Sequence, residues 1–117
     1  MKRGGRESMI PKTKCAADGI ALIRDKVLKG NYSWRQHAIE RSIEREIADA
    51  DVAKAILGGE IIEEYPEDKY GPSCLIFGRT KQGRPIHVQC SLPPEVWIIT
   101  LYEPDPKEWL DFKKRRV

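Results

Sequence analysis

Two adjacent glycines, Gly58 and Gly59, divide the chain into stretches of different hydrophobic pattern. Before them, apolar residues recur three or four positions apart, which is the spacing of a helix that packs on one side. After them come short apolar runs separated by turn residues, which is typical of strands. Helices followed by consecutive strands predict an α+β fold, with N-terminal helices packed on a four-stranded antiparallel meander sheet.

Capping residues place the expected helices. They cover residues 20–28 after Asp18, the stretch 34–45 with Ser33 as a possible cap, and a third helix from Asp49 to the glycine pair. Residues 32–34 are expected to form a short extended link before the second helix. The expected strands are residues 60–65, 73–79, 84–91 and 96–102, and a last helical turn is expected at residues 107–112. Residues 80–83, Thr-Lys-Gln-Gly, form a tight turn that pairs the second and third strands antiparallel.

Side chains alternate between the two faces of a sheet, so the pairing of those two strands decides what is buried. We expect Phe77 and Val88 to share the face that the helices cover. That face would consist of Leu75, Phe77, Ile86, Val88 and Cys90. The opposite face would then carry Cys74, Ile76, His87 and Gln89.

Charge is concentrated at the two ends of the chain. Residues 1–15 carry five cations and one anion, and residues 107–117 carry five cations and two anions. The total is +3, so the middle is acidic at −4. We expect a mobile basic segment at residues 1–15, one domain at 16–112 and a basic tail at 113–117. Basic ends suit a polyanion or an acidic partner, although solubilising tails are an equally good interpretation.

Several function classes are disfavoured by composition. The longest apolar runs fall far below the roughly 20 residues of a membrane span, and no secretory signal is recognisable. Three cysteines without a CxxC pair favour a reducing, cytoplasmic location and give no zinc framework. We therefore expect no metal, no cofactor and no contact with a membrane.

The helix expected at residues 34–45 carries the first candidate site. Residues four apart share a helix face, so His37, Arg41 and Arg45 lie in one line. Two permanent cations and an imidazole that titrates near neutral pH suit a phosphate group. The alternative is an ordinary solvated face, because Glu40 and Glu44 offer local ion pairs worth only about 0.2–0.5 kcal/mol each.

The second histidine, His87, lies in the middle of the third expected strand. It is expected on the sheet face away from the helices, where it has two possible roles. It is either a catalytic group or a partly buried histidine that is satisfied by a backbone carbonyl.

An ordered set of motifs over residues 32–110 resembles the DUF4258 family of small bacterial proteins. The motifs are WRQHAIERSIEREI, DVAKAILGGEIIEEYP, PSCLIFGR, GRPIHV and WIITLYEPDPKEW. This resemblance implies a RelE/barnase-like fold, as in toxins of toxin–antitoxin pairs, with a zinc-finger and helix-turn-helix antitoxin as a possible partner. The family pattern H-x-x-x-R-x-x-x-R falls on His37, Arg41 and Arg45, its H-V pair on His87 and Val88, and its Y-x-P on Tyr102 and Pro104. Glu46 departs from the glycine that often follows the helix.

Together, the residues and the resemblance predict a toxin-type ribonuclease that acts on RNA without metal, by attack of the 2′-hydroxyl on the adjacent phosphate. His37 and His87 would be the catalytic acid and base. Arg41 and Arg45 would neutralise the phosphate, and Tyr102 would position or stack the substrate. The competing hypothesis is a non-catalytic module that binds nucleic acid or protein. The two hypotheses differ in geometry, because a nuclease needs both histidines at one cleft and a binding module does not.

Overall fold

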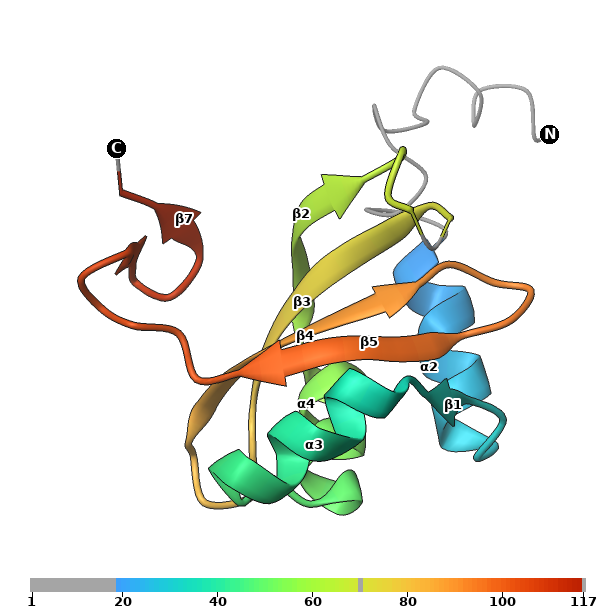
Figure 1. Ribbon diagram of the computed structural model, residues 1–117, viewed down its shortest axis with the longest axis horizontal. Coiled ribbons are helices and arrows are strands. Elements are labelled where there is room, and N and C mark those ends of the chain that lie inside the picture. Colours follow the sequence, from blue (N-terminus) through green and yellow to red (C-terminus); the bar gives the residue numbers. More distant parts are fainter. Residues whose placement is uncertain (1–18, 70, 117) are drawn as a thin grey trace, which may run out of the picture.

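Five strands form one mixed sheet in the computed structural model, which describes residues 19–69 and 71–116, and three helices pack against it (Figure 1). In chain order the elements are α2 (Ile20–Leu28), β1 (Ser33–Trp34), α3 (Gln36–Arg45), α4 (Asp49–Gly58), β2 (Glu60–Tyr65), β3 (Ser73–Arg79), β4 (Pro85–Ser91), β5 (Trp97–Tyr102), β6 (Trp109–Leu110) and β7 (Lys114–Arg115). The α+β prediction is confirmed. The predictions for residues 1–15 and for Asp18 lie outside the described residues.

The sheet order is β1-β5-β4-β3-β2. Strands β2 to β5 pair antiparallel with their sequence neighbours, whereas β1 pairs parallel with β5. The expectation of an entirely antiparallel four-stranded sheet is therefore incomplete. Ser33, predicted as a helix cap, belongs instead to β1, where its amide donates to the Val96 carbonyl at 3.0 Å.

The register of β3 against β4 corrects the predicted faces. Residues directly opposite in an antiparallel pair share a face, and the structure pairs Ile76 with Val88 and Phe77 with His87. The helix-covered face therefore carries Cys74, Ile76, Ile86, Val88 and Cys90, and Leu75 and Phe77 lie with His87 and Gln89 on the other face. The prediction was right for β4 and wrong by one residue for β3.

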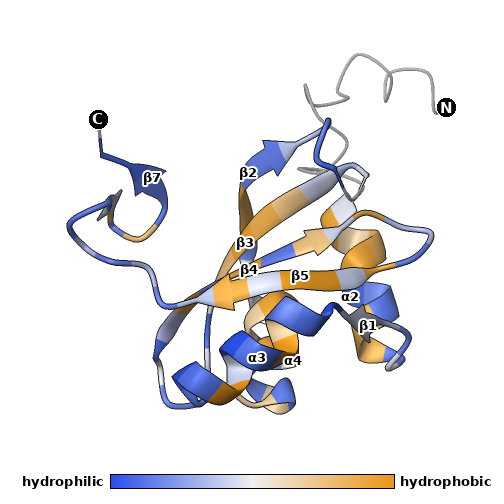
Figure 2. Ribbon diagram, in the orientation of Figure 1, coloured by the Kyte–Doolittle hydropathy of each residue, from blue (hydrophilic) through white to orange (hydrophobic). Residues whose placement is uncertain are grey.

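The main core lies between the helices and the sheet. Its helix residues are Ile23, Val27, Ala38, Val52, Ala55 and Ile56, which pack on apolar residues of β3, β4 and β5. Figure 2 shows β3 and β5 as largely hydrophobic strands. Helix α4 approaches β3 so closely that a Cβ on Gly78 would lie 2.1 Å from the Ala55 carbonyl oxygen. Only glycine fits at that contact, which fixes α4 against the sheet.

Residues 105–116, which we call the C-terminal strap, turn back after β5. The expected helical turn at 107–112 is wrong, because β6 and β7 form a small antiparallel hairpin instead. Lys113 and Arg115 form ion pairs with Glu60 and Glu63 of β2, at 2.9 and 2.8 Å. The last described residues thus contact the strand at the edge of the sheet. Figure 2 shows the strap as largely hydrophilic.

Candidate functional site

Helix α3 has a firmly defined direction although no side chain caps its first turn. The preceding strand β1 is hydrogen-bonded to β5, and the Arg35 amide donates to the Ile98 carbonyl at 2.9 Å. The Arg35 guanidinium stacks 4.2 Å from the centroid of the Trp97 ring. These contacts anchor the start of α3 to the edge of the sheet.

The end of α3 is fixed by a Schellman turn. The Glu46 amide donates to the Ile43 carbonyl and the Ile47 amide to the Ser42 carbonyl, at 3.3 and 2.9 Å. Glu46 adopts the left-handed conformation, φ 56° and ψ 49°, that glycine usually occupies at this position. Arg84 then donates to the Arg45 and Glu46 carbonyls, at 2.6 and 2.9 Å, and satisfies acceptors that the helix leaves free.

The three basic residues of α3 lie exposed on one side of the helix, and we call them the α3 basic face (His37, Arg41, Arg45). The His37 side chain is 80% exposed, and its Nδ1 lies 3.6 Å from Glu40. Arg41 lies 3.9 Å from Glu44. Ion pairs this long and this exposed restrain their side chains weakly, so the cations are available to a ligand.

His87 has the opposite environment. Its side chain is fully buried, and its two ring nitrogens lie 3.2 Å from the Tyr102 hydroxyl and 2.6 Å from the Phe112 carbonyl oxygen. A carbonyl only accepts, so Nε2 carries the proton and Nδ1 accepts from Tyr102. Burial lowers the pKa of His87 below its ordinary value of 6.5, which favours the neutral form of the ring.

Aromatic side chains complete the enclosure of His87. The Trp109 ring meets the imidazole edge to face with centroids 4.4 Å apart, and Tyr102 and Phe77 lie at 5.3 and 6.0 Å. Burial also raises the pKa of the Tyr102 hydroxyl. Trp109 and the Phe112 carbonyl belong to the strap, so the strap covers this part of the sheet. A backbone carbonyl therefore satisfies His87, as the second interpretation expected, although the side chain is fully rather than partly buried.

The five predicted site residues therefore fall into two groups. His37, Arg41 and Arg45 lie on α3, which packs on the helix-covered face, and His87 lies with Tyr102 on the strap-covered face. The sheet separates the groups, so the structure does not bring the two histidines to one cleft.

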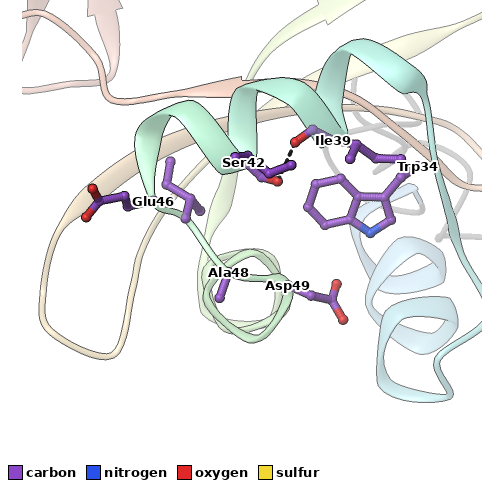
Figure 3. Close-up of a pocket in the computed structure, with 8 residues that line it drawn as sticks. Trp34, Ile39, Ser42, Glu46, Ala48 and Asp49 are labelled. Atoms are coloured by element: carbon purple, nitrogen blue, oxygen red, sulfur yellow. Dashed lines mark hydrogen bonds between the residues drawn. The ribbon is translucent and has the colours of Figure 1, made fainter.

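Sequence reasoning missed an apolar groove beside α3, with a volume of about 680 Å³ (Figure 3). It is lined by Trp34, Ile39, Ser42, Ile43, Glu46, Ile47, Ala48 and Asp49. Ile39 and Ile43 belong to the apolar side of α3, but only Ala38 of that helix is buried. The available signal was the width of the apolar stripe, because Ala38, Ile39 and Ile43 span more of the helix surface than one sheet contact covers.

Neither metal ligation nor a membrane span is found in residues 19–69 and 71–116. No group of three or more histidine, cysteine or acidic residues within that part could hold a metal ion. None of its helices combines the length and apolarity needed to cross a membrane.

The fold and the exposed basic helix define a small α+β protein with a candidate ligand-binding helix at the edge of its sheet. The chain belongs to the DUF4258 family, described as a domain of unknown function, whose model matches residues 34–103. That range runs from β1 to the residue after β5, so α2 and the strap lie outside it. No curated protein and no solved structure matches the chain.

Proposed function

We propose that this protein acts on RNA through the α3 basic face, and that it does so first of all as a binding module. The observation that carries the proposal is the exposed alignment of His37, Arg41 and Arg45 on a helix held at both ends. Arginine forks match phosphate oxygens, and residues one turn apart on a helix can contact a single-stranded backbone. A binding module needs no second histidine beside this face.

A toxin-type, metal-independent ribonuclease is the second candidate, and the His37–Glu40 contact favours it. A carboxylate near Nδ1 orients the imidazole and leaves Nε2 to take the proton from a 2′-hydroxyl as that oxygen attacks the phosphate. The bond from phosphorus to the 5′-oxygen then breaks, and water would protonate the leaving 5′-oxygen because His87 is buried on the other face. Arg41 and Arg45 would neutralise the charge that builds up on the phosphate. The RelE/barnase-like fold and the antitoxin partner that the family resemblance implies belong to this proposal, and so does the cytoplasmic location that the cysteine pattern favours.

One experiment tests both candidates. Full-length wild type, His37→Ala and the double variant Arg41→Ala/Arg45→Ala are mixed with a labelled RNA pool, with and without EDTA, and binding and cleavage are measured at several salt concentrations. The control is Lys29→Ala/Lys107→Ala, which also removes two exposed cations but lies off α3. Loss of each phosphate contact should flatten the salt dependence by about 0.7 in log–log slope.

We expect the Arg41/Arg45 variant to bind RNA less tightly than the control variant. Equal binding by these two variants would contradict the assigned surface. Cleavage by wild type that falls ~10²–10⁴-fold in His37→Ala would establish the ribonuclease. Cleavage that EDTA abolishes would overturn the metal-free mechanism, and absence of both binding and cleavage would overturn the proposal as a whole.

A further inference from the structure

The groove beside α3 exposes apolar side chains that a folded chain ordinarily buries. Ile43 is 72% exposed and Ile39 is 39% exposed, and the two lie one helical turn apart. Figure 3 shows the Trp34 ring between Ile39 of α3 and Asp49 of α4, so the groove runs between two helices. A contiguous apolar surface of this kind marks an interaction site more often than a scattered exposed leucine does.

The walls of the groove are held in place before any partner arrives. The Asp51 carboxylate accepts a hydrogen bond from the Ala48 amide at 3.0 Å, which fixes the first turn of α4. The Tyr32 hydroxyl donates to Asp49 at 2.7 Å, and the Schellman turn fixes Glu46. Binding to a preformed groove loses little conformational entropy, because few side chains of the groove must be immobilised when the ligand binds.

The charge around the groove is acidic. Among residues 19–69 and 71–116, Glu46 and Asp49 line it and no cation does. At 100° per residue, Glu40 lies next to the Ile39–Ile43 ridge on one side of α3, Glu44 lies further round on that same side, and Arg41 lies on the far side of the helix. An apolar floor with acidic borders fits an apolar stripe bordered by lysine or arginine. A second copy of α3 would bring glutamates against glutamates, which disfavours self-association.

We propose that this groove binds an amphipathic helix of a partner protein, with apolar residues one turn apart and lysine or arginine on both flanks. Helix-in-groove recognition uses anchors at i, i+3, i+4 and i+7, and the spacing of Ile39 and Ile43 matches one turn of such a ligand. The proposal concerns a different side of α3 from the basic face. The proposal is therefore independent of whether the basic face binds RNA.

The test uses a fluorescent synthetic peptide, about four helical turns long, with leucine at i, i+3, i+4 and i+7 and lysine on both flanks. A matched peptide carries glutamate in place of every lysine. Full-length wild type, Ile43→Glu and Asp49→Lys are titrated with each peptide. The matched control is Leu28→Glu, because Leu28 on α2 is 74% exposed, close to the exposure of Ile43, and lies outside the groove.

We expect the lysine peptide to bind wild type and Leu28→Glu with similar affinity, and to bind Ile43→Glu at least about tenfold more weakly, as an anchor residue requires. Asp49→Lys should weaken binding of the lysine peptide and should not weaken binding of the glutamate peptide. Three results would overturn the proposal: equal binding of the two peptides, equal losses in Ile43→Glu and Leu28→Glu, or no binding at all. Sedimentation tests the alternative occupant. If wild type sediments as a dimer and Ile43→Glu as a monomer, the groove binds a second copy of this chain and not a partner helix, which would also overturn the proposal. RNA binding of Ile43→Glu should match wild type.

Discussion

The two faces of the sheet are covered in different ways. Helices cover one face with interlocking aliphatic side chains and a contact so close that Gly78 has no room for a Cβ. The strap covers the other face with aromatic rings around one neutral histidine, and exposed ion pairs hold it to β2. The helix side is a conventional core, whereas the strap side depends on a few specific contacts that single substitutions can remove.

The largest expected effect comes from Trp109, the main side chain of the strap. Trp109 is 2% exposed and packs on His87, so Trp109→Ala should lower the free energy of unfolding by about 3–5 kcal/mol. Urea unfolding measures this loss. Leu110→Ala is the control, because Leu110 is 46% exposed and a surface substitution should change stability by no more than about 0.5 kcal/mol. Equal small effects would mean that the strap does not support the domain.

Acid should weaken the strap side before the helix side. Burial lowers the pKa of His87 in the folded protein, so the unfolded chain binds the proton more readily. The stability that neutral His87 contributes is complete above its ordinary pKa of 6.5, and it is lost as pH falls from there through the lowered pKa. The slope is at most about 1.4 kcal/mol per pH unit.

Urea unfolding from pH 8 to pH 5 measures that slope. His87→Gln should flatten it, and His37→Ala should leave it unchanged because His37 lies on α3, away from the strap. A steep fall that survives in His87→Gln would assign the acid sensitivity to other groups.

Two residues with similar left-handed backbone conformations allow the helix side and the strap side of the sheet to be compared. Glu46 after α3 and Asp111 in the strap both have positive φ, 56° and 53°. Glu46→Gly should stabilise the protein by about 1 kcal/mol, because a left-handed non-glycine residue costs roughly 1–2 kcal/mol. Asp111→Gly should gain less, since aspartate tolerates this conformation better than glutamate. Thermal melts of the two variants show which substitution raises the melting temperature more. If Glu46→Gly lowers the melting temperature, the Glu46 side chain makes a stabilising contact.

The smallest expected effect concerns the ion pairs of the strap. Lys113→Ala removes the pair with Glu60 and should cost about 0.2–1 kcal/mol, as exposed pairs do. Lys114→Ala is the control, because no ion pair of Lys114 is found in the described part of the chain. The difference between the two variants in urea unfolding should shrink in 1 M salt, where the screening length is only about 3 Å. A difference that persists in high salt would point to packing of the lysine stem.

The sequence predicted the elements better than their faces. Strands β2 and β3 begin and end where the turn residues placed them, and Gly58 and Gly59 do separate helices from strands. The faces of β3 were wrong because both are covered. Cys74, Leu75, Ile76 and Phe77 are all apolar, so no alternation marks the core side, and a register error of one residue reverses every side chain.

The site was only partly predictable for a similar reason. Helical spacing gave the line of His37, Arg41 and Arg45, which the structure exposes together. Nothing local indicated that the strap returns to cover His87, because that contact joins residues 25 apart through a backbone carbonyl. The groove beside α3 was missed because the width of the apolar stripe shows that some of its residues stay uncovered but not which isoleucine is exposed.

The shape of strand β2 has a consequence for how the sheet ends. An edge strand presents unpaired backbone groups that another chain can extend. In β2 the register shifts between Ile61 and Glu63, three of its residues are glutamates, and Pro66 follows directly. At the opposite edge, β1 contributes only two residues. A further strand from a second molecule or a growing fibril would have to pair with an irregular, charged strand at one edge of the sheet or with a two-residue strand at the other. Both edges therefore disfavour the addition of strands.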